Sequence, residues 1–277
     1  MVPVLGMHRS GTSMFTRALN LLGMELGGPL MAPQPDNPKG FWENEFFWEL
    51  DVRILRALGC HMNGYGSAED LLTIPARSAR VERSDANLQA IQSYLDRTFT
   101  GHVWGWKDPR TVLLFPFWLG LLADLGFRQV RPTVIARHPG ACVRSLVRRG
   151  DLQPLAGALK VPPARLALEM WKAYSLALVA ICDATGCYTS LHEWMLDRDL
   201  AASELRRCAQ YVGLGDGVDL TPALEWVDPT SVHHSGSSGE GVDEEALEVF
   251  ALLQSRAAAQ RAAWLQTRAG VLQVRES

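Results

Sequence analysis

The first residues of the chain constrain its fold more than any other segment. The apolar residues Val2–Leu5 predict a buried β-strand, which runs directly into the turn Gly6-Met7-His8-Arg9-Ser10-Gly11-Thr12-Ser13 and then into a helix. A strand-to-helix turn of this kind directs several backbone N–H groups at one point, and the dipole of the following helix favours an anion there. The segment therefore predicts an α/β fold with a phosphate-binding loop at a strand end.

The position of the positive charge in this loop narrows the choice of ligand. The spacing Gly-x4-Gly-x-Ser is that of a P-loop, but Thr12 stands where a nucleotide triphosphatase needs its lysine. The cation is supplied from within the loop instead, by Arg9. This arrangement favours a phosphate-bearing donor other than ATP.

The composition is typical of a globular protein. The chain has 277 residues, 47% of them hydrophobic and 21% charged, with a net charge of −3. This length allows one large domain or two small ones, and we predict a single domain over residues 1–277. The net charge gives no support for a nucleic-acid partner, and the local cluster of Arg137, Arg144, Arg148 and Arg149 is sufficient for binding a small anion.

Three features predict a cytoplasmic location. The phosphate loop begins at residue 6, which leaves no room before it for a signal peptide or an anchor. No run of about 18 apolar residues is present to span a membrane. The five cysteines are odd in number and scattered, which indicates reduced thiols, and we interpret Cys182 and Cys187 as core residues.

Predicted strands alternate with predicted helices along most of the chain. Further strands are expected at 103–106, 132–136 and 188–191, and helices at 44–58, 85–98, 113–125 with an interruption near Pro116, 141–149, 163–185 and 200–212. Residues 27–40 and 59–83 are expected to be loops, the second of them a possible lid, and residues 228–243 a flexible connection to a C-terminal helix at 244–268. Such alternation implies right-handed crossovers and a three-layer fold around a mostly parallel sheet.

Polar residues follow three of the predicted strands at the point where each strand ends. The loop at Gly6, the segment at Lys107 and the segment at Arg137 all occupy such positions. In parallel sheets, ligands bind at the carboxyl ends of the strands. We therefore expect these three segments to converge on one rim.

Two motifs carry a resemblance to a known family. The loop His8–Ser13 resembles the 5′-phosphosulfate loop of sulfotransferases that use 3′-phosphoadenosine 5′-phosphosulfate (PAPS), particularly the bacterial and carbohydrate-type branches. The strand that ends in Arg137-x-Pro139, followed by Ser145, resembles the 3′-phosphate motif of the same family. The motifs occur in the family's order, and the resemblance covers roughly residues 2–215.

The resemblance implies how a donor would be held. The two motifs would form two anion-binding sites, one for each anionic end of PAPS. Arg137 could form a bidentate pair with the 3′-phosphate. The residues expected to bind the donor are Gly6, His8, Arg9, Ser10, Gly11, Thr12, Ser13, Arg137 and Ser145. Sulfuryl transfer resembles phosphoryl transfer with less negative charge to neutralise, so no metal ion is expected.

The catalytic residues expected from the same resemblance are Glu43, Lys107 and Arg9. Lys107 lies at a strand end, where related enzymes place a lysine near the sulfuryl or leaving oxygen. Glu43 is the preferred general base because the segment Asn37-Pro38-Lys39-Gly40-Phe41-Trp42-Glu43 resembles one in which related enzymes carry a glutamate. Its aromatic neighbours can raise its pKa, which suits that role. Glu45 and His61 are the alternatives, and Asp108 is expected to orient Lys107 or the loop.

The sequence thus predicts transfer of a sulfuryl group from PAPS to a hydroxyl of a small molecule, a sugar or a lipid-linked metabolite. Two other interpretations remain open at this point: a P-loop kinase or nucleotide triphosphatase, and a non-catalytic module that binds 3′,5′-adenosine bisphosphate (PAP). The acceptor, the oligomeric state and the role of the C-terminal residues are not specified by these motifs.

Overall fold

Four parallel strands form the centre of the computed structural model, which describes residues 1–35, 37–227 and 241–275. The strands are β1 (Val2–Leu5), β2 (Gly105–Lys107), β3 (Thr133–Ala136) and β4 (Tyr188–Leu191), in the order β2-β1-β3-β4. All three pairings are parallel, with Val4 opposite both Lys107 and Thr133. The carboxyl ends of the strands therefore lie on one rim, as the sequence predicts.

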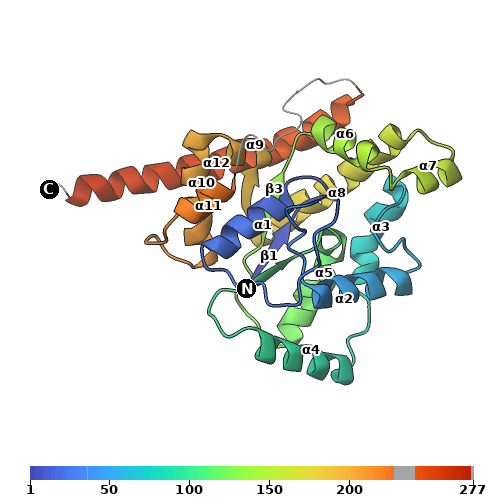
Figure 1. The fold of residues 1–277 in the computed structure, drawn as a ribbon, viewed down its shortest axis with the longest axis horizontal. Helices are drawn as coiled ribbons and strands as arrows, with labels where there is room; N and C mark the ends of the chain where they lie inside the picture. The colour runs from blue at the N-terminus through green and yellow to red at the C-terminus, as the bar shows by residue number, and fades with distance from the viewer. Residues whose placement is uncertain (36, 228–240, 276–277) are drawn as a thin grey trace.

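Helices cover both faces of the sheet (Figure 1). Their bounds are α1 Thr12–Leu21, α2 Glu45–Ala57, α3 Ala68–Ser78, α4 Asp85–Thr98, α5 Thr111–Asp124, α6 Pro139–Arg149, α7 Gln153–Leu159, α8 Pro163–Thr185, α9 His192–Leu196, α10 Arg198–Val212, α11 Thr221–Trp226 and α12 Glu244–Arg275. Together with the parallel sheet they make the predicted three-layer α/β fold. The C-terminal end of α12 extends beyond the other elements (Figure 1).

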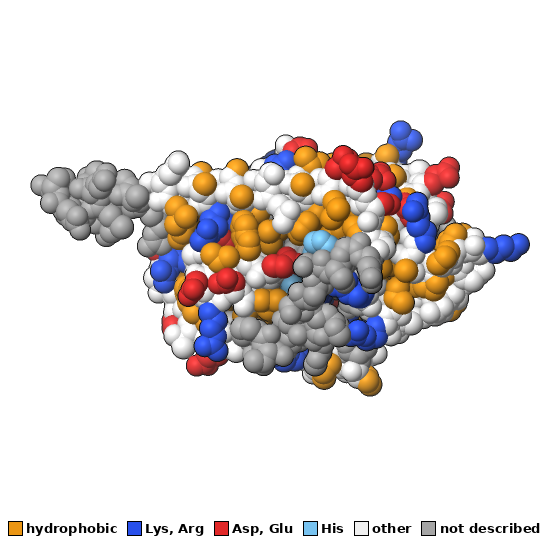
Figure 2. Space-filling view, turned by 90° about the horizontal axis from the view of Figure 1, so that it is seen from above, with side chains coloured by type: hydrophobic (Ala, Val, Ile, Leu, Met, Phe, Trp, Pro, Cys, Tyr) orange, Lys and Arg blue, Asp and Glu red, His pale blue; other side chains and the backbone are white. Residues whose placement is uncertain are grey.

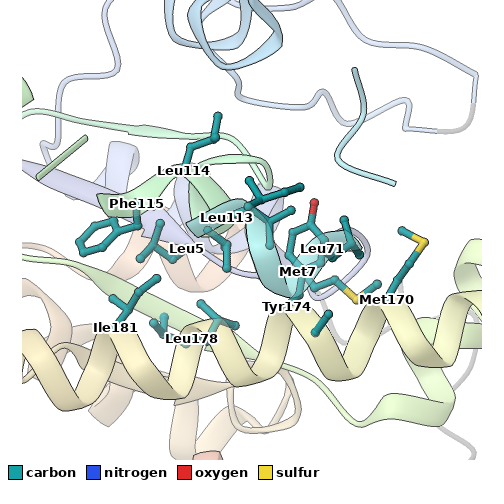
Figure 3. Packing of buried hydrophobic residues seen from close by; sticks show 14 of the residues in the cluster. Leu5, Met7, Leu71, Leu113, Leu114, Phe115, Met170, Tyr174, Leu178 and Ile181 are labelled. Carbon is teal, nitrogen blue, oxygen red and sulfur yellow. The ribbon is translucent and has the colours of Figure 1, made fainter. Parts of the chain in front are cut away.

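The alternation of side chains along the strands divides the apolar core in two. Leu5 and Val134 pack on one face of the sheet with α5 and α8, whereas Val4 and Ile135 pack on the other face with α1 and α10. Figure 3 shows Leu5 close to side chains of α5 and α8 in the first of these cores. Because both faces are covered, every strand residue is buried, which explains the continuous apolar runs in the sequence.

Two predictions about helices are wrong. Residues 59–83 do not form a loop throughout, because α3 begins after Ser67, whose side chain accepts a hydrogen bond from the backbone N–H of Asp70. Pro75 lies within α3, as Pro116 lies within α5, which continues where an interruption was expected. A proline removes one helical hydrogen bond, but α5 buries Phe117 and Trp118 around it.

The cysteines also require a correction. Cys182 and Cys187 are buried, as expected of core residues, but they are joined in a disulfide rather than reduced. Cys60, Cys142 and Cys208 are free thiols. The disulfide joins the end of α8 to the residue before β4.

The remaining predictions concern the C-terminal part and the surface. The expected flexible segment, 228–243, falls for the most part outside the described residues, and the helix expected at 244–268 is α12. Among the described residues, no helix has the length and apolar character that crossing a membrane requires. On the face drawn in Figure 2, basic and acidic side chains stand interspersed with apolar ones.

Candidate active site

A cavity of about 670 Å³ lies at the carboxyl ends of the strands. Each strand contributes to it through the residues that follow it: the loop at His8–Met14 after β1, Lys107 and Pro109 at β2, Arg137 after β3, and His192 after β4. The segment at 37–43 and the end of α6 complete the wall. The three segments that were expected to converge on one rim therefore line one cavity.

The loop between β1 and α1 is shaped by two glycines. A Cβ at Gly6 would lie 2.8 Å from the carbonyl oxygen of Ile135, so the loop can approach β3 only without a side chain there. Gly11 has a φ of 90°, a conformation that disfavours residues with a side chain, and it packs against the ring of His192. The loop thus delivers the N-terminus of α1, with its unpaired backbone N–H groups, to the cavity.

Not every loop residue predicted to bind the donor faces the cavity. His8, Arg9, Gly11, Thr12 and Ser13 line it, whereas Gly6 and Ser10 do not. The backbone N–H and the hydroxyl of Ser10 both donate to the carbonyl oxygen of Met7, at 3.2 and 2.7 Å. Ser10 therefore stabilises the turn through the backbone of Met7. It is 2% exposed and does not contact the cavity.

Hydrogen bonds connect the loop to Arg137, which follows β3, and to Ser145 in α6. Nε of Arg9 donates to Oγ of Ser145 at 2.9 Å, and Arg137 donates to the carbonyl oxygen of Arg9 at 2.9 Å. Arg9 itself has a φ of 67°, in the left-handed region, which turns that carbonyl toward Arg137. The two sequence motifs are therefore joined to each other at one side of the cavity.

Glu43 and Lys107 form a buried ion pair in the cavity wall. Nζ of Lys107 lies 2.6 Å from Oε1 of Glu43 and 3.3 Å from Oγ of Ser13, at the first turn of α1. Burial raises the pKa of Glu43 above its ordinary value, although the positive charges of Lys107 and Arg110 oppose this. Oε2 of Glu43 is 4.0 Å from the guanidinium of Arg110 and is not engaged by Lys107.

Asp108 has a different partner from the one expected. Both of its carboxylate oxygens accept hydrogen bonds from one terminal nitrogen of Arg110, at 2.9 Å, rather than from Lys107. Arg110 also donates to the carbonyl oxygen of Met62 and to Oδ1 of Asn63. Asp108 and Arg110 therefore fix the segment before α3 against the end of β2, a role the sequence motifs did not indicate.

His8 is enclosed by this same segment. Its Nε2 lies 3.0 Å from the carbonyl oxygen of Asn63, and its ring makes edge contacts with Tyr65 and Tyr174. Burial, together with the charges of Arg110, Arg149 and Lys107, holds its pKa well below the ordinary value. The imidazole is therefore neutral at physiological pH.

His192 is a cavity residue that sequence reasoning missed. It is 8% exposed, lies beside Gly11, and lines the cavity near Arg137. Burial and the charge of Arg137 lower its pKa to about 3, so this ring is neutral as well. The signal was available, because His192 follows β4 directly, as Arg137 follows β3.

The two alternative bases lie outside the cavity. Glu45 is the first residue of α2 and His61 is exposed, with its ring stacked on Tyr65. Neither side chain is part of the cavity wall. The placement favours Glu43 among the three candidates.

Comparison with known proteins supports the fold. The structure is similar to a sulfotransferase domain from the curacin biosynthetic pathway, with a TM-score of 0.52 over 92% of this chain and 97% of that one. The two sequences are 13% identical, so the similarity establishes the fold alone. No family model and no curated protein matches the chain. The chain therefore has the α/β fold of a sulfotransferase domain.

Proposed function

We propose that this protein is a sulfotransferase that moves the sulfuryl group of PAPS to a hydroxyl of a small molecule, a sugar or a lipid-linked metabolite. The observation that carries the proposal is that Arg9 and Arg137 line one cavity and are joined by a hydrogen bond of 2.9 Å. Had the two motifs opened into separate cavities, one nucleotide could not contact both. The fold supports the same conclusion independently.

The residues of the cavity suit a donor with two anionic ends. The N-terminus of α1, Arg9 and the hydroxyls of Thr12 and Ser13 would hold the 5′-phosphosulfate. The guanidinium of Arg137 donates one hydrogen bond among the described residues, to the carbonyl oxygen of Arg9, which leaves further N–H groups for the 3′-phosphate, together with Ser145. A volume of about 670 Å³ is within the range of cavities that hold such ligands.

Glu43 and Lys107 would carry the transfer itself. The acceptor oxygen forms a bond to sulfur while the bond from sulfur to the bridging oxygen of the donor breaks, and PAP leaves. Oε2 of Glu43 receives the proton of the acceptor hydroxyl, and its raised pKa suits that role. Lys107, held by Ser13 beside the loop, stabilises the negative charge that develops on the bridging oxygen.

Nucleotide binding tests the proposal against the two alternatives. PAP should raise the melting temperature more than ATP with Mg²⁺, or than adenosine 5′-phosphate, which lacks the 3′-phosphate. The Arg137→Ala variant should lose that preference, because a hydrogen-bonded charge contributes about 1.5–3 kcal/mol. Arg128→Ala, at an exposed arginine outside the cavity, is the matched control and should retain it.

Two results would contradict the proposal. Stronger stabilisation by ATP with Mg²⁺ than by PAP would favour a kinase or nucleotide triphosphatase. Binding of PAP without transfer from radiolabelled PAPS to any hydroxyl compound in a broad acceptor panel would favour a non-catalytic module.

A further inference from the structure

The hydrogen bond of His8 fixes which ring nitrogen carries the proton. Nε2 faces the carbonyl oxygen of Asn63 at 3.0 Å, and a carbonyl oxygen can only accept. Nε2 must therefore donate. In a neutral imidazole the other nitrogen, Nδ1, then has a lone pair and no hydrogen.

The protein holds this tautomer firmly. Asn63 is positioned by the guanidinium of Arg110, which bonds both its side chain and the preceding carbonyl of Met62. The rings of Tyr65 and Tyr174 contact the imidazole with their planes 72° from its own. A flip of the His8 ring would exchange Nε2 for Cε1 and so lose the hydrogen bond to Asn63, and a shift of the proton to Nδ1 would place the lone pair of Nε2 against the carbonyl oxygen.

Nδ1 of His8 is a hydrogen-bond acceptor that the protein does not use. The side chain is 7% exposed and lines the cavity, and within the part of the chain that the structure describes its ring hydrogen-bonds to Asn63 alone. Because His8 lines the cavity, Nδ1 is available to accept a hydrogen bond from a ligand that binds there.

The chemistry of Nδ1 determines which ligand group it can take. A lone pair repels the oxygens of a sulfuryl or phosphate group, so the anionic ends of the donor are excluded at this point. Lys107, Arg110 and Arg149 lie close enough to lower the pKa of His8, and their charges disfavour an ammonium group. The remaining partners are neutral O–H and N–H donors, of which a hydroxyl compound, the acceptor proposed above, supplies O–H groups.

The O–H group at this point is different from the one that reacts. The attacking hydroxyl has one proton, and under the proposed function, on which this inference rests, Glu43 receives it. We infer that Nδ1 of His8 binds a second hydroxyl of the acceptor, and that the acceptor is therefore a polyhydroxyl compound such as a sugar or polyol. His8 thereby moves from the predicted donor site to the acceptor site, as a specificity-determining residue.

Nitrogen NMR of the histidine rings tests the tautomer and the contact directly. In protein saturated with PAP, the His8 resonances, assigned by comparison with His8→Gln, should show hydrogen on Nε2 and a lone pair on Nδ1. Glycerol should shift the Nδ1 resonance, whereas 1-propanol, with a single hydroxyl, should not. A proton found on Nδ1, a shift of Nδ1 caused by PAP alone, or no shift with glycerol would overturn the inference.

Two isosteric variants test the same contact through transfer from radiolabelled PAPS. The amide of asparagine can place an oxygen near the position of Nδ1, whereas that of glutamine places its nitrogen near Nε2. Wild type and His8→Asn should therefore prefer glycerol to 1-propanol in kcat/KM by roughly fivefold, the value of one neutral hydrogen bond, and His8→Gln should not. Retention of the preference in His8→Gln would overturn the inference.

These outcomes separate the inference from the proposed function. If PAP stabilises the protein and PAPS is turned over but glycerol and 1-propanol behave alike, the role of His8 fails and the sulfotransferase assignment stands. If PAP does not bind, the sulfotransferase assignment itself is wrong, and the inference about His8, which rests on it, falls with it. Should neither alcohol be a substrate, the NMR titration still decides the question.

Discussion

Two buried ion pairs of the same length lie in different parts of the molecule. Lys107 and Glu43 are 2.6 Å apart in the cavity wall, and Arg207 and Glu204, both in α10, are 2.6 Å apart on the side of that helix that contacts β4. All four side chains are at most 8% exposed. Distance and burial therefore do not distinguish a pair proposed to take part in catalysis from a structural one.

The surroundings of the two carboxylates do distinguish them. Oε2 of Glu204 accepts from Arg207, Tyr188 and Ser190, and Arg261 of α12 lies 3.6 Å from its other oxygen. Glu43 has one oxygen held by Lys107 and lines a cavity with the rest of its carboxylate. A buried ion pair becomes a candidate for chemistry when part of it remains accessible to a ligand.

The largest effect is expected on stability, at the enclosed pair. Glu204→Gln leaves the charge of Arg207 buried without its partner, which should lower the free energy of unfolding by about 3–5 kcal/mol. Urea denaturation would measure this, with the exposed Glu225→Gln as the control. PAP binding by the folded fraction should be unchanged. A loss no larger than that of the control would remove the distinction between the two pairs.

The next effect is expected on catalysis, at the open pair. Glu43→Gln should reduce transfer from PAPS by about 10²-fold or more, since the amide cannot accept the proton, while the thermal shift with PAP persists. Glu45→Gln, two residues away and outside the cavity, is the matched control. If Glu45→Gln is the variant that loses transfer, the base has been assigned to the wrong carboxylate.

The smallest effect is expected in the pH dependence. Because burial raises the pKa of Glu43, the base is protonated, and kcat/KM falls, as the pH drops through a value above that of an ordinary glutamate. Arg110 lowers the pKa of Glu43, so Arg110→Lys, which retains the charge, should move this acidic limb little. A profile of kcat/KM against pH would measure both. An acidic limb at the ordinary glutamate pKa would indicate that Glu43 is solvated.

Strand ends were predictable because they combine two local signals. Apolar runs mark buried strands, and a polar residue directly after the run marks the rim, which gave Lys107 and Arg137 from sequence alone. The same rule applied to the run before His192 would have given that residue. The fold class followed from the alternation of such runs with helices.

The two wrong predictions, at α3 and α5, come from segments in which a proline lies among residues that otherwise favour a helix. Pro75 obscured the helical spacing of Leu71, Ile74 and Ser78, although Ser67 and Asp70 carry the signature of a helix start. Pro116 favours an interruption of α5, whereas the apolar residues around it are buried in the core and keep the helix continuous. The ion pair of Asp108 with Arg110 and the disulfide join residues only two and five positions apart, but the spacing of apolar residues that marks helices and strands gives no sign of either contact.

The hydrogen bonds from Arg9 to Ser145 and from Arg137 to Arg9 have a mechanical consequence. They hold the loop after β1 against α6 and the residues that lead into it. Under the proposed function, the distance between the two phosphate-binding groups is therefore fixed before the nucleotide binds. A nucleotide whose charged groups are too close together or too far apart cannot engage both ends at once.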